Sequence, residues 1–121
     1  MILADTSVWI DHLRSRDERL SALLENRELL MHPFVIGEIA LGHLPQRDRF
    51  LSRLQSLPQT LLARDEQVLG LIDRHRLVGA GVGYIDLHLV VSAMLSECQF
   101  WTRDRRLSKV CDALGLSPRL H

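Results

Sequence analysis

The chain is poor in cysteine and contains no long apolar run. Its two cysteines, Cys98 and Cys111, form no CxxC pair and have no nearby histidine at metal-site spacing. We therefore expect two buried, reduced thiols in a cytoplasmic protein. The longest apolar stretch, residues 87–95, is too short to span a bilayer. The first residues lack a basic region followed by a long apolar segment, so we expect no signal peptide and no membrane association.

Net charge is also absent, because acidic and basic residues number fifteen each. Overall charge therefore does not indicate a nucleic-acid-binding protein, and any basic surface must be local. Lysine is nearly absent: Lys109 is the one lysine, and the other basic residues are arginine. We prefer the base composition of the source genome as the interpretation of this bias, although arginine also suits phosphate contacts. With 121 residues, 46% of them apolar, the chain predicts one domain, residues 1–121, with one core.

Short apolar segments alternate with helical patterns along the chain. This alternation predicts an α/β fold, a three-layer α/β/α sandwich around a central, mostly parallel sheet. We expect strands at residues 2–3, 29–31, 60–63 and 100–102, and a short edge strand within 116–120. After a first helix that follows residue 5, we expect helices at residues 17–26, 34–43, 47–56, 65–77, 84–97 and 104–114.

Asp5 lies at the junction between the first predicted strand and the first helix. Thr6 or Ser7 is the predicted N-cap, and Val8 and Trp9 begin the apolar helix face. In open α/β sheets, ligands bind at the carboxyl ends of parallel strands. A charged side chain directly after a buried strand needs hydrogen bonds, a counter-charge or a metal. We therefore interpret Asp5 as the first member of a site.

Three other acids have positions unlike those of ordinary surface acids. Glu38 and Asp86 lie on the apolar stripes of their predicted helices, and Asp86 is also in a first helical turn. Asp104 comes two residues after the predicted strand 100–102, a placement like that of Asp5. Two acids thus follow strand ends, and two are predicted to look inward from helices.

Each acid also has a purely structural interpretation. Asp86 and Asp104 fit helix starts, Glu38 fits a pair with a buried arginine, and Asp5 fits an ordinary cap. The four together are harder to explain in this way, because a small core rarely tolerates several inward acids without a cation. Oxygen ligands suit Mg²⁺ or Mn²⁺, ions that commonly activate water and neutralise charge in reactions at phosphates.

The ordered set of these motifs resembles the PIN-domain ribonucleases, and within them the VapC toxins of bacterial toxin–antitoxin modules. The motifs are Asp5-Thr6-Ser7, Glu38 in Val-Ile-Gly-Glu-Ile-Ala, Asp86 in Tyr-Ile-Asp-Leu, and Thr102-Arg103-Asp104. The resemblance spans nearly the whole chain, and all four acids are present.

The resemblance implies a Mg²⁺-dependent endoribonuclease, with Mn²⁺ as the other candidate ion. By match, Asp5, Glu38, Asp86 and Asp104 would be the catalytic acids and metal ligands, and Ser7 and Thr102 would orient the carboxylates. Metal-activated water would attack an RNA phosphodiester and leave a 5′-phosphate and a 3′-hydroxyl. The resemblance also implies a homodimer and a cognate antitoxin, whose tail lies along a groove near the active site.

RNA binding by a neutral chain would need local positive charge. Candidate phosphate contacts are the arginines around Asp104 and after the first helix; an ordinary solvated face is an equally good interpretation for each. These candidates are Arg14, Arg103, Arg105 and Arg106.

The aromatic residues are expected to belong to the core. Trp9, Tyr84 and Trp101 each lie in an apolar pattern, which favours packing over base stacking. The histidines show no ligand spacing, and no role is assigned to His12 or His88.

Two other classes of function compete with the nuclease. A signalling receiver domain is also doubly wound with an acidic Mg²⁺ pocket, but it needs paired acids after the first strand and a lysine after the fifth. Here Asp5 is single and Lys109 lies within a predicted helix. A PIN-like binding module without catalysis is the other alternative, although such a chain would be free to lose its acids.

Overall fold

A three-stranded parallel sheet forms the centre of the fold. The computed structural model describes residues 1–120, and its strand order is β2-β1-β3. The strands are β1 (Ile2–Ala4), β2 (Leu29–Leu30) and β3 (Gln99–Trp101). β1 pairs in parallel with both neighbours, with Ile2 opposite Leu29 and Ala4 opposite Trp101. All three residues of β1 are buried, as expected for a central strand covered on both faces.

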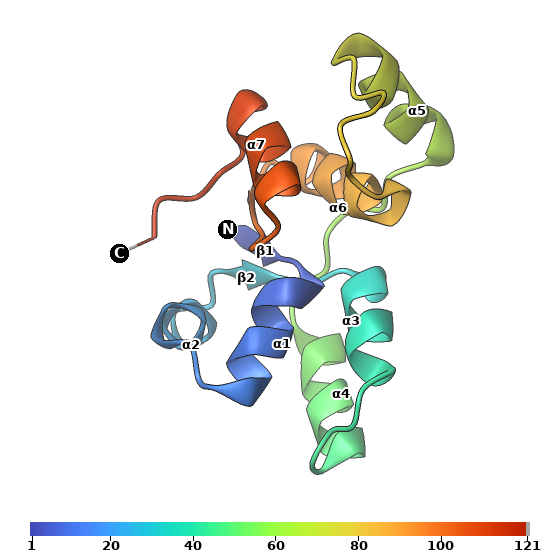
Figure 1. Ribbon diagram of the computed structural model, residues 1–121. Coiled ribbons are helices and arrows are strands. Elements are labelled where there is room, and N and C mark those ends of the chain that lie inside the picture. Colours follow the sequence, from blue (N-terminus) through green and yellow to red (C-terminus); the bar gives the residue numbers. More distant parts are fainter. Residues whose placement is uncertain (121) are drawn as a thin grey trace.

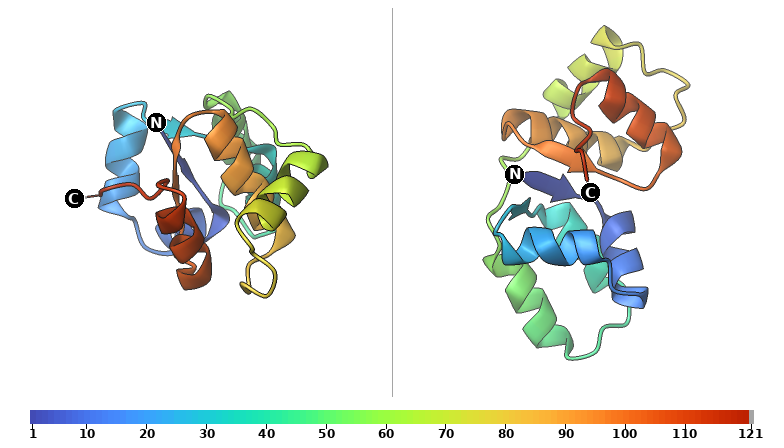
Figure 2. Two further views of the ribbon diagram at one scale, coloured as in Figure 1. Left: turned by 90° about the horizontal axis from the view of Figure 1, so that it is seen from above. Right: turned by 90° about the vertical axis from the view of Figure 1, so that its left-hand side faces the viewer.

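Helices cover the sheet in two layers, which confirms the predicted α/β/α sandwich. In Figure 1, α1 to α4 lie on one side of the strands and α5 to α7 lie on the other; the right-hand view of Figure 2 shows the same separation. Trp9 and Phe100 are among the largest fully buried side chains of the core between them. The helices are α1 (Thr6–Arg14), α2 (Glu18–Glu25), α3 (Pro33–Ala40), α4 (Arg47–Ser56), α5 (Asp65–Arg74), α6 (Tyr84–Leu95) and α7 (Arg105–Ala113).

Two predicted strands are wrong. Residues 60–63 form no strand, and the neighbouring pairing is one isolated bridge between Met31 and Gln59. The backbone amides of Leu61 and Ala63 donate instead to the hydroxyls of Ser96 and Ser92. These side chains replace the partner strand that the apolar sequence suggested.

The C-terminal segment has no strand within residues 116–120 either. It makes one backbone hydrogen bond to the sheet, from the Phe100 amide to the Leu116 carbonyl at 2.9 Å. A single bond anchors the segment beside β3 without continuing the ladder.

Three predicted helices, α3, α5 and α6, end two or three residues earlier than expected. α5 and α6 end just before residues with positive φ angles: Arg76 has a φ of 52° and Glu97 has a φ of 53°. In each case the next amide bonds back to the last turn, from Leu77 to the Ile72 carbonyl and from Cys98 to the Ala93 carbonyl. This is a Schellman ending made without glycine, so the sequence carries no signal for it.

α3 ends at Ala40 for another reason. The guanidinium group of Arg47 donates to the backbone carbonyls of Ala40 and Gly42. It thereby satisfies carbonyl groups that a longer helix would have bonded internally.

Both cysteines are free and buried, as predicted. Burial raises the pKa of the Cys111 thiol to about 12. Within residues 1–120, none of the helices has the length and hydropathy that crossing a membrane requires.

Candidate functional site

Asp5 is a buried acid at the carboxyl end of β1. Its backbone amide donates to the Trp101 carbonyl at 3.0 Å, so the ends of β1 and β3 lie side by side. Its carboxylate caps α1 by accepting from the amides of Ser7 at 3.0 Å and Val8 at 3.4 Å. The predicted N-cap at Thr6 or Ser7 is therefore wrong by one or two residues, because Asp5 itself reaches the free amides of the first turn.

Two hydroxyl groups hold the same carboxylate. Ser7 Oγ donates to Asp5 Oδ1 and Thr102 Oγ1 donates to Asp5 Oδ2, each at 2.5 Å. Burial raises the pKa of Asp5, although these hydrogen bonds act in the opposite direction. Both carboxylate oxygens are thus fixed in direction, and the charged form is costly without a nearby positive charge.

Asp104 is tied to the same strand end through Thr102. Its amide donates to Thr102 Oγ1 at 3.1 Å, and its carboxylate accepts from the Leu107 amide at 2.9 Å as the N-cap of α7. The helix-start interpretation of Asp104 is therefore correct in geometry. This does not remove the residue from the site, because Asp104 is exposed and its charge acts on Asp86.

Asp86 lies in the first turn of α6 and is half-buried. Burial raises its pKa, and the negative charges of Asp5, Asp104 and Glu38 raise it further. The charges of the other three predicted acids therefore reach Asp86, although the four acids come from four separate parts of the chain.

Glu38 is exposed, and the prediction that it faces inward is wrong. Val35 and Ile39 are the residues of α3 that enter the core, whereas Phe34 is 41% exposed. Glu38 and Phe34 line a surface pocket of about 350 Å³ together with Asp86. The polar and apolar residues on this side of α3 form the wall of a pocket rather than part of the core.

The arrangement suits a hard cation only with water in its shell. Across residues 1–120, no three His, Cys, Asp or Glu side chains are grouped closely enough to hold an ion by themselves. Mg²⁺ typically keeps several waters and binds through one or two carboxylates plus substrate phosphate oxygens. The donor chemistry fits: the acids offer oxygen ligands alone, and their mutual repulsion, seen at Asp86, would be relieved by a cation.

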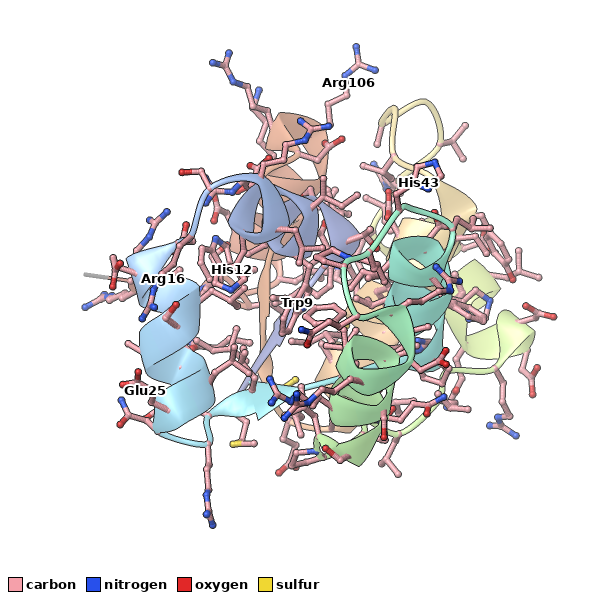
Figure 3. All side chains as sticks on the ribbon, turned by 90° about the horizontal axis from the view of Figure 1, so that it is seen from below. Trp9, His12, Arg16, Glu25, His43 and Arg106 are labelled. Carbon is pink, nitrogen blue, oxygen red and sulfur yellow. The ribbon has the colours of Figure 1, made fainter. Side chains whose placement is uncertain are left out.

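The arginine candidates divide into two groups. Arg103 is held by ion pairs, from Nε to Asp11 at 2.9 Å and from Nη2 to Asp17 at 2.5 Å, and it lies over the Trp101 ring. Arg14, Arg105 and Arg106 are exposed. Figure 3 shows Arg106 projecting outward at the edge of the molecule.

A further group of residues, which the sequence did not indicate as part of a site, adjoins the pocket that Asp86 lines. Tyr84 is 40% exposed and lines the same pocket as Asp86, so its expected place in the core is wrong. Its hydroxyl donates to Asp65 Oδ1 at 2.6 Å, and His88 Nε2 lies 2.8 Å from the same oxygen. Hydrogen bonds from Tyr84 and His88 lower the pKa of Asp65. No sequence spacing indicated this contact between α5 and α6.

Comparison with known proteins agrees with the predicted fold and family. The profile of the PIN domain family matches residues 2–113, and the chain belongs to this family. Within the family it is of the VapC type. It is 46% identical over 118 residues to Ribonuclease VapC32 of Mycobacterium tuberculosis strains H37Rv and CDC 1551, covering 97% of this chain and 95% of that protein. The receiver-domain alternative is therefore wrong.

A solved structure shows the same fold. The crystal structure of PAE2754 from Pyrobaculum aerophilum superposes with a TM-score of 0.57 at 18% identity, covering 94% of this chain and 88% of the other. At this identity the similarity concerns the fold alone.

Proposed function

We propose that this chain is a divalent-metal-dependent endoribonuclease and acts as the toxin of a toxin–antitoxin module. The observation that carries the proposal is the placement of the acids: Asp5 and Asp104 follow the neighbouring strands β1 and β3 and are connected through Thr102, and Glu38 and Asp86 line one pocket. The negative charges of the other three acids also raise the pKa of Asp86, after burial. The similarity to a protein named as a ribonuclease supports the same activity.

Asp5, Glu38, Asp86 and Asp104 would hold the metal, Mg²⁺ or Mn²⁺. A bound cation of this kind supplies an activated water and neutralises charge at the phosphate. The protein supplies orientation: Ser7 and Thr102 fix the two oxygens of Asp5, and Thr102 also fixes the Asp104 amide. Hydrolysis would cut an RNA phosphodiester and leave a 5′-phosphate and a 3′-hydroxyl.

RNA would approach over exposed arginines. Arg105 and Arg106 begin α7 directly after Asp104, and Arg14 ends α1. All three are exposed and are suited to phosphate contacts. Arg103 is the weakest of the four candidates, because two ion pairs already occupy its guanidinium group.

A second groove supports the antitoxin as partner. It has a volume of about 360 Å³, runs between α1 and α3, and is lined by Ile10, Leu13 and Ile39 together with Arg14 and Glu38. Glu38 also lines the pocket that contains Asp86. An apolar peptide segment in this groove would therefore reach the acids at one end and block them.

The expected homodimer and cytoplasmic location belong to the same proposal. Leu61 and Leu62, just before α5, and Leu69 on α5 are 62%, 57% and 54% exposed. Exposed leucines of this kind are suited to contact with a second copy of the chain.

The test is cleavage of total RNA by the purified protein, with Mg²⁺ or with EDTA, beside the Asp5→Asn variant. We expect cutting that needs Mg²⁺ and is lost in the variant. Asp48→Asn, an exposed acid on α4 outside the pocket, is the matched control and keeps full activity. Metal binding without cutting by the folded, antitoxin-free protein would support a PIN-like binding module instead.

A further inference from the structure

Two aromatic side chains are exposed in a chain that has few of them. The chain has six aromatic residues, all within the part that the structure describes. Four of them are buried or partly buried, whereas Phe34 is 41% exposed and Tyr84 is 40% exposed. The four are Trp9, Phe50, Phe100 and Trp101.

Both exposed rings line one pocket. Phe34 comes from α3 and Tyr84 from the start of α6, and the same pocket is lined by Glu38 and Asp86. Glu38 lies one helical turn after Phe34, and Asp86 lies two residues after Tyr84. Both exposed rings therefore share this pocket with two of the candidate metal-binding acids.

The rings are held by an aromatic cluster. The His88 ring packs edge-on against Tyr84, with centroids 4.9 Å apart, and against Phe34, with centroids 5.8 Å apart. The His32 ring also packs against Phe34, with centroids 4.8 Å apart. The Tyr84 hydroxyl is fixed by its 2.6 Å bond to Asp65. These contacts hold both rings at the pocket with one part of each ring exposed to solvent.

We propose that Phe34 and Tyr84 bind an unpaired nucleobase of the RNA next to the bond that is cut. The inference rests on the proposed nuclease function and names a part of the substrate that the acids do not contact. Side-chain recognition of RNA usually uses splayed, single-stranded bases that stack on aromatic rings. Stacking tolerates different bases, and its loss typically weakens binding by about ten-fold or more per base.

A purely structural role is the alternative. Asp65 is the first residue of α5, so its bonds to Tyr84 and His88 also join α5 to α6. That role requires the hydroxyl of Tyr84 but leaves the exposed face of the ring unexplained. It also assigns nothing to the exposed ring of Phe34. The two roles therefore separate when the ring and the hydroxyl are changed independently.

The experiment measures RNA binding without cleavage, in the Asp5→Asn background. The probes are a fluorescent single-stranded RNA dodecamer of randomised sequence and a dodecamer with the same backbone but abasic sites. We expect Asp5→Asn to bind the base-containing RNA about ten-fold tighter than the abasic RNA. Adding Phe34→Ala or Tyr84→Ala should remove most of this difference without changing the affinity for the abasic chain.

Matched variants control for folding and for general loss of apolar surface. Val78→Ala shortens an exposed apolar side chain in the loop between α5 and α6, outside the pocket, and should leave the preference for bases unchanged. Tyr84→Phe keeps the ring and should keep the preference, even if loss of the hydroxyl lowers the melting temperature. Phe34→Leu keeps a large apolar side chain without an aromatic face and should lose the preference while remaining folded.

The outcomes separate the base-binding inference from the nuclease proposal. If the aromatic variants retain the preference for bases while the unmodified protein cuts RNA with Mg²⁺, the inference is wrong and the nuclease stands. If Asp5→Asn binds neither RNA and the unmodified protein cuts none, both are wrong. Loss of the preference in Tyr84→Phe as well would assign the effect to the Asp65 contact and overturn the role of the ring.

Discussion

The hydroxyl of Thr102 donates a hydrogen bond of 2.5 Å to Oδ2 of Asp5, across a separation of 97 residues in the chain. The contact exists because β1 and β3 are parallel neighbours with Ala4 opposite Trp101, so the residues that follow each strand meet at the same edge. Thr102 also accepts from the amide of Asp104. One hydroxyl therefore connects two of the four acids.

Thr102→Val tests whether this connection matters for activity. Valine keeps the shape of the side chain but removes both hydrogen bonds, so Oδ2 of Asp5 loses the hydroxyl that orients it. We expect RNA cleavage to fall by roughly 10- to 100-fold, the usual cost of removing a hydrogen bond behind a metal ligand. The folded state should lose about 1 kcal/mol. Thr102→Ser keeps the hydroxyl and should keep most of the activity; equal loss in both variants would contradict a role for the bond.

Asp86→Asn should stabilise the metal-free protein. Its carboxyl has a raised pKa in the folded state, because burial and three neighbouring acids disfavour the charge. For such a group, stability is highest below the unfolded pKa and is lost as the pH rises through the folded pKa. Above the folded pKa the penalty is fully present, so removing the charge should raise the melting temperature there and have little effect in acid.

Mg²⁺ should make the unmodified protein more stable than Asp86→Asn. It binds the folded state alone and should raise the melting temperature of the unmodified protein in proportion to the logarithm of its concentration. Asp86→Asn should gain much less. Thermal melts with EDTA and with increasing Mg²⁺ measure both effects, and an equal Mg²⁺ response in the two proteins would exclude Asp86 from the metal site.

The arginines near the acids should differ in what they do. Arg103→Gln breaks ion pairs with Asp11 and Asp17, so we expect a loss of up to about 1 kcal/mol in stability. Arg105→Gln touches no ion pair in the described residues and should instead weaken RNA binding and reduce its salt dependence by about one phosphate contact. Binding isotherms of Asp5→Asn protein over a range of salt concentrations, beside thermal melts, separate the two effects. The reverse pattern would make Arg103 the RNA contact.

The sequence predicted the order of elements because apolar periodicity reflects burial directly. All seven helices and the three strands of the sheet occur where the pattern indicated. The segment 60–63 was misassigned because a strand needs a partner as well as apolar residues, and here Ser92 and Ser96 supply the bonds. Helix ends at Arg76 and Glu97 were missed because non-glycine residues take the left-handed conformation there.

The four candidate acids stand out in the sequence because each lies at a strand end or on an apolar stripe. Whether each acid is buried or exposed cannot be predicted from the same pattern, because apolar neighbours of Glu38 line a pocket rather than the core. The contact of Tyr84 with Asp65 spans α5 and α6, and a pairing of two helices across a loop leaves no periodic trace. The same holds for His32, whose partners depend on tertiary packing.

His32 should make the protein sensitive to mild acid. It is buried, and its Nδ1 accepts from the Phe34 amide at 3.0 Å while Nε2 lies 3.2 Å from the Ser92 hydroxyl. Accepting at Nδ1 places the proton of the neutral ring on Nε2. Burial, with the charge of His88 as a smaller cause, lowers the pKa of His32 from 6.5 to about 4. As the pH falls, His32 is therefore protonated near pH 6.5 in the unfolded chain but only near pH 4 in the folded chain.

Stability from His32 is fully present above pH 6.5 and is lost as the pH falls toward 4, by up to about 3 kcal/mol. Asp5 and Asp86 act in the opposite direction, because their raised pKa values favour the folded state in acid. His32→Asn isolates the effect: its amide oxygen can still accept from Phe34, and all other groups are unchanged. We expect the variant to be less stable than the unmodified protein at pH 7 and the two to converge toward pH 4. Urea unfolding at several pH values measures the gap, and a gap that stays constant would show that His32 does not titrate in this range.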